Sequence, residues 1–377
     1  MGKRIFSYLF ILLISFSSAE VGAWLGVQTL RKRLVFYNAP LLSTYDDYMR
    51  NRDPVLGWPS VKMLREQCDP SGSRPIPSYP TAGTACISLY GDSFTWSDSV
   101  VDSAAWSNQL SLLRHCRVSN YGVPGYGTDQ AFLRFEQNMG DEAPIVLLNH
   151  FSGDIRRNVT QLRNLTSDDD YLLLKPRFIL EGHSLKLIPL LLPSCEDAEA
   201  IANHPEKTLP YEHFAPGGST GIVRAAFPYS LSLLKALGNE HIRAKLADIP
   251  VWEPYYHPTH PSQALDITYG IMQKFIELAR ARGKTPLVTI IPNAHDIEFF
   301  RAHGRWTYSP LIERLEKEAV PHFDFGPELL KRMNDLEVCS LMEQGNCYGH
   351  YNSEGYKLMA EVLDRYLTET AVGKSLN

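Results

Sequence analysis

The sequence has no excess of basic residues, because 37 Lys and Arg stand against 42 Asp and Glu, a formal net charge of −5. Nucleic-acid-binding domains usually carry a clear basic excess, so no nucleic-acid partner is predicted. Long apolar runs are scarce as well. Only the N-terminal stretch is long and apolar enough to meet a bilayer, which excludes a polytopic membrane protein. A disordered chain is excluded because 44% of the residues are apolar.

Cysteine pairs with metal-binding spacing are also lacking. None of the six cysteines belongs to a C-x-x-C pair, and no nearby histidines complete a zinc set, so neither a metal nor another cofactor is predicted. An even number of cysteines agrees with an oxidising compartment, where they can form disulfides. Because six cysteines allow many connectivities, we predict only one local pair, Cys339 with Cys347.

Residues 1–33 form either a secretory signal peptide or a membrane anchor. Basic residues precede the near-apolar run Ile5–Phe16, and small residues follow it up to Ala19, a candidate cleavage point. In the alternative, an uncleaved helix continues to Leu30. Glu20 would then lie in hydrocarbon, where a carboxylate is costly, whereas the shorter run alone falls below the roughly 20 residues that a spanning helix needs. Both alternatives predict an extracytoplasmic protein that is periplasmic, secreted or anchored facing outward.

Downstream of an irregular lead-in at 34–83, short apolar runs alternate with amphipathic segments. Strands are predicted at Cys86–Tyr90, Arg117–Asn120, Ala143–Asn149, Pro286–Ile291 and Phe323–Phe325, and helices at Trp106–His115, Thr128–Glu136, Ser262–Arg282, Ser309–Ala319 and Ser353–Leu367. This alternation predicts an α/β fold with a mainly parallel sheet and helices on both faces, a three-layer α/β/α sandwich. We expect one such domain at 84–370, interrupted by an insertion at about 160–260 that contains a hairpin within Phe178–Leu192.

The tetrapeptide Gly91–Phe94 follows the first predicted strand directly. In such sheets ligands bind beyond the carboxyl ends of the strands. A serine in a turn that leads into a helix presents its hydroxyl where developing negative charge is favoured, so Ser93 is a candidate nucleophile. The alternative is that Ser93 only caps a helix.

Two further segments complete a candidate site. His350 lies in the loop before the last predicted helix, at the sheet edge that also carries Ser93, and could act as the general base that a serine nucleophile requires. The alternative is a loop histidine without a role, since the chain has 12 histidines. Closely spaced glycines in Asn120–Gly127 allow backbone N–H groups to approach an oxyanion, although a plain turn would have the same sequence.

Together these motifs resemble those of the SGNH/GDSL hydrolase family, in its extracytoplasmic, bacterial-type branch. Gly91-Asp-Ser93 matches the first family block, whose serine is the nucleophile. The segment Asn120–Gly125 resembles the second block, whose later glycine, here Gly125, donates a backbone N–H to the oxyanion. His350, with Asn352 and Gly355 after it, resembles the histidine block. The resemblance implies an SGNH (flavodoxin-like) sandwich and an exported serine esterase without a cofactor.

Two positions depart from the family pattern. Gly153 stands where the family has an asparagine that donates to the oxyanion; Asn158, or else Asn149, could supply that donor. Cys347 stands where the family has an aspartate three residues before the histidine, with Glu343 as a more remote carboxylate. A Ser–His dyad oriented by a backbone carbonyl is therefore expected, because oxyanion binding and substrate positioning retain much catalysis when one triad member is lost.

Three functions remain open from the sequence. The first is hydrolysis of an acyl ester through an acyl-enzyme, on an acylated small molecule or an O-acylated glycan, with the pocket shaped by aromatic and histidine side chains at 255–260. The second is transfer of the acyl group to a surface polysaccharide. The third is a non-catalytic glycan-binding protein that kept the fold. A membrane is a further partner if the N-terminal segment is not cleaved.

Overall fold

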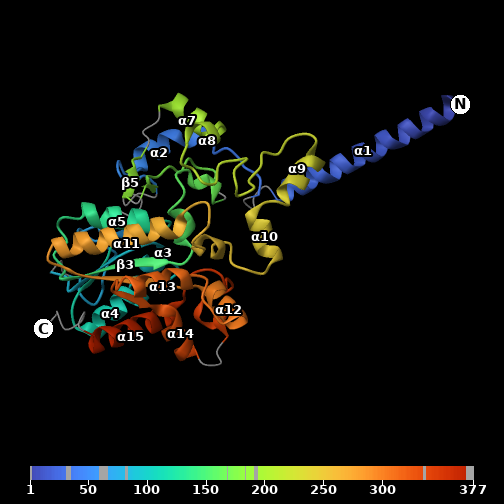
Figure 1. Ribbon diagram of the computed structural model, residues 1–377. Coiled ribbons are helices and arrows are strands. Elements are labelled where there is room, and N and C mark those ends of the chain that lie inside the picture. Colours follow the sequence, from blue (N-terminus) through green and yellow to red (C-terminus); the bar gives the residue numbers. More distant parts are fainter. Residues whose placement is uncertain are drawn as a thin grey trace. The chain divides into compact units, whose positions relative to one another are not determined.

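The computed structural model describes residues 2–30, 35–58, 67–80, 84–167, 169–182, 184–190, 194–333 and 337–370 (Figure 1). Its internal contacts divide the chain into two compact units. The α/β unit comprises Met49–Val159, Leu174–Leu191 and Trp252–Asn377, and the N-terminal unit comprises Met1–Tyr48, Thr160–Leu173 and Leu192–Val251. The insertion expected at 160–260 is thus divided, because its hairpin and its last residues belong to the α/β unit.

The α/β unit is built on a five-stranded sheet with the strand order β2-β1-β3-β6-β7. All neighbouring strands are parallel. Their bounds are β1 Ile87–Tyr90, β2 Val118–Asn120, β3 Ile145–Phe151, β6 Thr285–Ile291 and β7 His322–Asp324. The three central strands, β1, β3 and β6, are buried almost throughout, which agrees with their mostly apolar sequences in a sheet that is covered on both faces.

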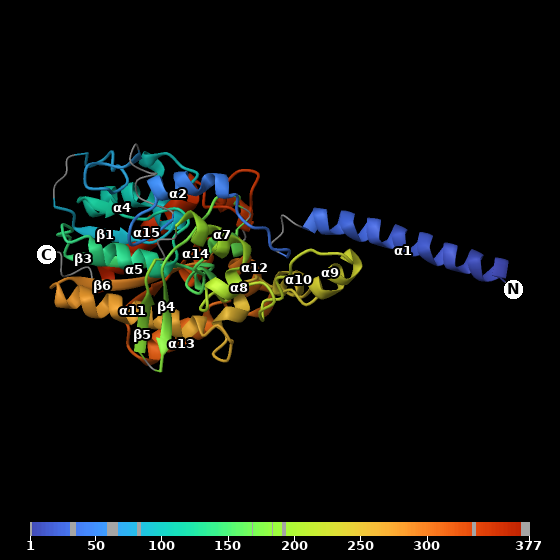
Figure 2. The same cartoon turned by 90° about the horizontal axis from the view of Figure 1, so that it is seen from above.

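Helices cover both faces of this sheet (Figures 1 and 2). One face carries α5 (Thr128–Gln137) and α11 (Ala264–Ala281), and the other carries α4 (Trp106–Arg114), α14 (Phe325–Met333) and α15 (Ser353–Glu369). The predicted mainly parallel α/β/α sandwich is confirmed.

An antiparallel hairpin of β4 (Arg177–Glu181) and β5 (Ser184–Ile188) packs against α11. Further helices among the described residues of this unit are α3 Ser93–Trp96, η3 Asp102–Ala104, α6 Asp154–Arg157, η5 Glu253–Tyr256, α12 Ala294–His303, α13 Ser309–Lys317 and η6 Val338–Leu341.

The strand order reverses beside β1, which pairs with β2 on one side and with β3 on the other. In doubly wound sheets the crevice for a ligand opens at this switch point, beyond the carboxyl ends of the strands. The chain leaves β1 at Gly91, so the segment that carries Ser93 begins at this point.

The N-terminal unit is mostly helical. Its elements are α1 Gly2–Leu30, η1 Leu42–Thr44, α2 Tyr45–Asn51, whose last residues fall in the α/β unit, η4 Arg163–Leu165, α7 Cys195–Asn203, α8 Pro205–Thr208, α9 Tyr229–Ala236 and α10 Glu240–Leu246. The helix α1 is long and apolar enough to cross a membrane. Its C-terminal end packs against α9, and the side chains of Val27, Val35, Phe36 and Ala236 form a buried apolar cluster there.

Two disulfides lie in the α/β unit. Cys339 is bonded to Cys347, which confirms the predicted local pair, and Cys86 is bonded to Cys116, which no spacing argument identified. Cys68 and Cys195 are free thiols. Both bonded pairs agree with an oxidising compartment.

Candidate active site

Ser93 is the first residue of the short helix α3, directly after β1. The carboxylate of Asp92 caps this helix: its Oδ1 accepts hydrogen bonds from the backbone N–H groups of Phe94 (2.9 Å) and Thr95 (3.4 Å). The turn requires a glycine at Gly91, because a Cβ there would overlap the Thr95 hydroxyl. Ser93 therefore caps nothing itself, and its hydroxyl is left for another partner.

His350 lies in the loop that precedes α15. Asn352 caps this helix by accepting from the N–H of Gly355 (3.0 Å). The loop is tied down by the disulfide Cys339–Cys347 and by a hydrogen bond from the Glu343 N–H to the His350 carbonyl (2.8 Å). The backbone of the loop that carries His350 is thus held by covalent and hydrogen-bond restraints.

The structure brings Ser93 and His350 together, although they are 257 positions apart in the sequence. The distance from Ser93 Oγ to His350 Nε2 is 2.8 Å, which is the length of a hydrogen bond. The ring of Phe94 lies 4.9 Å from the imidazole and stacks on Phe151 at 4.3 Å. A serine nucleophile and its general base would need a contact of this length.

A carboxylate that the sequence analysis did not single out, that of Asp98, faces this pair. Its Oδ2 lies 4.0 Å from His350 Nε2, on the same ring nitrogen that faces Ser93. Burial raises the pKa of Asp98, and the facing His350 opposes that shift. Among the residues with described positions, no hydrogen bond or ion pair joins the Glu343 side chain or a backbone carbonyl to the imidazole, so neither expected orienting group is found there.

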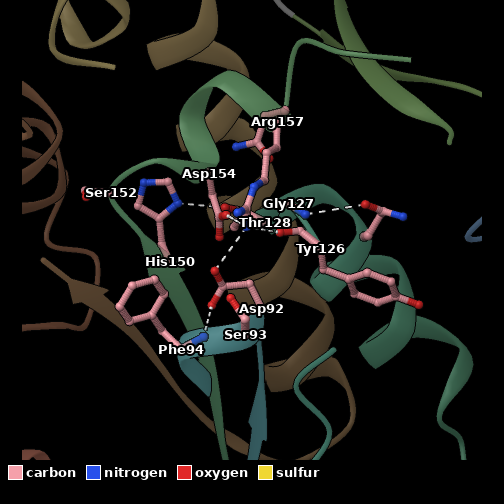
Figure 3. A network of polar contacts seen from close by, with 12 residues as sticks. Asp92, Ser93, Phe94, Tyr126, Gly127, Thr128, His150, Ser152, Asp154 and Arg157 are labelled. Carbon is pink, nitrogen blue, oxygen red and sulfur yellow. Dashed lines mark hydrogen bonds and ion pairs between the residues drawn. The ribbon is translucent and has the colours of Figure 1, made fainter. Parts of the chain in front are cut away.

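Arg157 connects the two segments expected to surround an oxyanion (Figure 3). Its Nη1 donates to Asp154 Oδ1 (2.6 Å), to the carbonyl of Tyr126 (2.8 Å) and to Asp92 Oδ2 (3.1 Å). Asp92 directly precedes Ser93, and Tyr126 directly follows Gly125. One guanidinium therefore holds the nucleophile turn and the glycine loop in a fixed relation.

The glycine loop packs closely on α3. A Cβ at Gly122 would lie 2.5 Å from the backbone nitrogen of Trp96, so only glycine fits there. Gly125 has a φ of +87°, in the region that favours glycine. The loop thus lies against the turn that carries Ser93, while the role of the Gly125 N–H stays a prediction.

The side chain of Asn158, the expected oxyanion donor, has partners inside the protein, and its donation to an oxyanion stays a prediction. Its side chain is fully buried, its Nδ2 donates to Thr268 Oγ1 (2.8 Å), and its Oδ1 accepts from the Asp129 N–H (3.2 Å). Asn158 therefore joins the helices α5 and α11. Asn149, the other asparagine considered, is also fully buried and accepts a hydrogen bond from Thr289 within the sheet.

The glycine in the asparagine position has a steric explanation. A Cβ at Gly153 would lie 2.5 Å from the ring of Phe151, so no side chain fits there while Phe151 stacks on Phe94. The stacked rings of Phe94 and Phe151, beside the dyad, thus occupy the space that a side chain at position 153 would need.

A buried hydrogen-bond network centred on His150 connects the elements that surround the site. His150, near the end of β3, interacts with Thr128 Oγ1 (2.6 Å) through Nδ1 and with the Tyr256 hydroxyl (2.8 Å) through Nε2. Burial, together with the charge of Arg157, lowers the pKa of His150 to about 3. This imidazole is neutral at physiological pH and joins β3 to α5 and η5.

Aromatic side chains extend from the dyad along one side of the α/β unit. The ring centroids follow one another at 4.3 Å (Phe94 to Phe151), 6.0 Å (to Trp252), 5.7 Å (to His295) and 3.9 Å (to Tyr348). Tyr348 is 52% exposed and lies two residues before His350. We call these five residues the aromatic row. They come from separate segments, so no local motif could reveal them.

The histidines at 257 and 260 lie elsewhere. With Tyr256, Glu253 and Arg305 they line a cavity of about 460 Å³ whose lining includes neither Ser93 nor His350. Within the described ranges, no group of three His, Cys, Asp or Glu side chains is placed to hold a metal ion.

Comparisons with known proteins find similarity at the level of structure. No family model and no curated protein matches the chain. A protein assigned to the lipolytic G-D-S-L family from Desulfitobacterium hafniense is 14% identical, with a TM-score of 0.35, over 74% of this chain and 97% of its own. A member of the same family from Veillonella parvula is 12% identical, with a TM-score of 0.39, over 75% and 98%. A Bacteroides fragilis protein proposed to be an acylhydrolase is 14% identical, with a TM-score of 0.34, over 84% and 95%.

Proposed function

We propose that the protein is an exported serine esterase that hydrolyses acyl esters through an acyl-enzyme. The observation that carries this proposal is the 2.8 Å contact between Ser93 Oγ and His350 Nε2 at the switch point of the sheet. A hydroxyl nucleophile is weak on its own and needs an adjacent base within hydrogen-bond reach. The resemblance of the surrounding motifs to the SGNH/GDSL blocks supports the same assignment.

In the proposed mechanism His350 Nε2 takes the proton of Ser93 as Oγ attacks the ester carbonyl. The tetrahedral oxyanion accepts hydrogen bonds from the backbone N–H groups of Ser93 and Gly125. His350 then returns the proton to the leaving alcohol, and the acyl group stays on Ser93. A water molecule, deprotonated by His350, attacks this ester, releases the acid and restores the serine.

Asp98 and Arg157 have supporting roles in this proposal. The carboxylate of Asp98 faces the ring nitrogen that becomes charged, so it stabilises the imidazolium formed in each half-reaction. Arg157 sets the spacing of the two donor segments through Asp92 and Tyr126. Preorganised donors of this kind usually contribute most to acyl-transfer catalysis.

The proposed substrate is an O-acylated glycan. The aromatic row starts at the buried rings of Phe94 and Phe151 beside the dyad and reaches the surface at the half-buried Trp252 and His295 and the exposed Tyr348, which offer aromatic faces to a sugar ring. Export is supported by the two disulfides and by the apolar helix α1. Transfer of the acyl group to a sugar hydroxyl would use the same acyl-enzyme, so an acceptor glycan belongs in the assay.

The test compares purified full-length wild type with Ser93→Ala and His350→Ala on nitrophenyl acetate and butyrate. Loss of the nucleophile or the base is expected to lower kcat by about 10²- to 10⁴-fold. Ser219→Ala and His303→Ala, at exposed positions remote in sequence from the dyad, are matched controls and should keep full activity. Equal rates for wild type and both dyad variants would refute the proposal. Rates at the uncatalysed background in all three would leave a non-catalytic glycan-binding protein, and equal rates above it would assign catalysis to other residues.

A further inference from the structure

The helix α1 has two different surfaces along its length. In the N-terminal half, from Arg4 to Ala19, every residue is exposed, whichever side of the helix it lies on. From Glu20 onward one stripe is covered: Glu20, Ala23 and Val27 are buried, at a spacing of three and four residues. Both views show α9 beside this C-terminal half of α1 (Figures 1 and 2). The contact is close, because Gly26 leaves room for Leu233.

The carboxylate of Glu20 is part of this contact. It accepts hydrogen bonds from the backbone N–H groups of Tyr229 (2.5 Å) and Ser230 (3.2 Å) and from the Ser230 hydroxyl. These are groups at the start of α9 that lack partners within their own helix. A charge that would be costly in a lone membrane helix is thus compensated by α9.

If α1 spans a bilayer, the position of Glu20 along α1 determines how deep the start of α9 lies in that bilayer. A bilayer core of about 30 Å takes about 20 helical residues, which corresponds to Ile5–Trp24 when the basic residues at 3–4 mark one boundary. Tyr8 and Trp24, both exposed, then fall near the two interfaces, where aromatic residues are enriched. Glu20 lies four residues, about 6 Å, inside the far boundary, and the start of α9 lies beside it.

The outer face of α9 is apolar and uncovered. Leu231, Leu234 and the C-cap residue Leu237 recur at a spacing of three residues and are 45%, 63% and 60% exposed, and Phe227, which lies just before the helix, is 67% exposed. The surface is continuous with α1, since the Phe227 ring lies 6.3 Å from that of Phe16. We call these four residues the α9 apolar face. A water-facing helix would not normally carry such a run.

We propose that α1 stays uncleaved and that the α9 apolar face is embedded beside it in the outer boundary of the lipid bilayer. The occupant of this face is lipid, because the surface continues that of a membrane-spanning helix and begins at hydrocarbon depth. Interfacial helices lie about 5–10 Å into this boundary, which agrees with the depth set by Glu20. The inference goes beyond the proposed activity and does not depend on it.

The test measures the depth of α9 in vesicles of phosphatidylethanolamine and phosphatidylglycerol that contain the full chain. A nitroxide is placed at Leu234→Cys in a Cys68→Ser, Cys195→Ser background, and its collisions with oxygen and with a water-soluble nickel chelate are compared. The matched control carries the label on the native, exposed Cys195 in a Cys68→Ser background.

We expect the label at 234 to collide more with oxygen than with nickel, and the label at 195 to show the reverse. A label at 234 that resembles the control would overturn the proposal, as would one shielded from both reagents, which would indicate a protein partner. Intact mass of the membrane-extracted protein gives a second measurement. Retention of residues 1–19 supports the anchor, and cleavage after Ala19 overturns it without affecting the esterase proposal.

Discussion

At the residue scale, the relation between His350 and its charged neighbours distinguishes this site from the pattern its motifs resemble. The position that holds the family aspartate is Cys347, which forms a disulfide. The nearby carboxylate belongs instead to Asp98, five residues after Ser93, and faces Nε2 from 4.0 Å. In the proposed mechanism, different groups would provide charge stabilisation of the imidazolium and orientation of the ring, which an aspartate on Nδ1 combines. Asp98 would supply the charge, and the loop closed by the Cys339–Cys347 disulfide would hold the segment that carries the ring.

Asp98→Asn is expected to lower kcat/KM about tenfold at pH 8, equivalent to about 1.4 kcal/mol. The loss should shrink at pH 5. Burial raises the pKa of Asp98, so the wild-type carboxyl becomes increasingly protonated as the pH falls and then resembles the amide. The measurement is the ratio of wild-type to variant kcat/KM across this pH range. Glu343→Gln is the comparison, and a larger loss in that variant would assign the charge to Glu343 instead.

Arg157→Gln tests the connection between the nucleophile turn and the glycine loop. The substitution removes the donor shared by Asp92 and Tyr126, so kcat should fall by about 10²-fold, the order of a lost oxyanion donor, with little change in KM. Arg156→Gln, the neighbouring arginine, is the matched control and should retain kcat. An unchanged kcat in Arg157→Gln would mean that the two segments hold their positions without the guanidinium.

The sequence was sufficient to predict Ser93 and His350, because each stands in a local motif next to a recognisable strand or helix. Asp98 and Arg157 were missed because their roles depend on distances between segments rather than on spacing along the chain. The partners of Asn158 could not be foreseen for a similar reason. One turn of α6 places its amide against Thr268 of α11, and a spacing argument cannot determine which way that turn faces.

At the scale of elements, the buried imidazole of His150 joins β3, α5 and η5. Its pKa is lowered to about 3 from an ordinary value of 6.5. Between these pH values this histidine is therefore protonated in the unfolded chain and neutral in the folded protein. The resulting stability is fully present above pH 6.5 and is lost as the pH falls toward 3, by about 1.4 kcal/mol per pH unit.

His150→Gln should remove this dependence. Urea unfolding at pH 7.5 and pH 5 is expected to show a larger loss of unfolding free energy in wild type than in the variant. The difference between the two proteins isolates His150 from the other titrating groups. Equal losses would show that His150 becomes protonated in the folded state without cost.

Regular elements were predictable where the sequence pattern is strong. All five strands and all five predicted helices of the sheet layers occur near their expected positions, because unbroken apolar runs and amphipathic repeats reflect burial directly. The helices α7 to α10 were not predicted. Their segments are short, and α9 has apolar residues on the side facing α1 and on the uncovered side alike, so no single helical face stands out from the sequence.

At the scale of the whole molecule, the dyad, Asp98, Arg157 and the aromatic row all belong to the α/β unit. Deleting residues 1–30 should therefore leave ester hydrolysis intact. The same deletion uncovers Val35, Phe36 and Ala236, so the N-terminal unit should melt earlier in calorimetry while the α/β transition stays in place. If activity were lost at the temperature of that early transition, the site would depend on the N-terminal unit, which would contradict its placement within the α/β unit alone.

The division into units could not be derived from the sequence. The insertion expected at about 160–260 was located by its broken pattern, but its hairpin at 174–191 and its residues from Trp252 onward belong with the α/β unit, and the lead-in divides between Tyr48 and Met49. Which segments associate depends on long-range contacts such as that between Phe36 and Val223. Neither segment carries a periodic pattern that identifies its partner.

The most direct test of the central claim is covalent labelling of the native full-length protein with a fluorophosphonate, followed by peptide mass mapping. The account predicts one adduct, on Ser93, and strongly reduced labelling in His350→Ala, because the imidazole activates that hydroxyl from 2.8 Å. A protein that hydrolyses esters yet carries no adduct on Ser93, or carries it on another residue, would contradict the account.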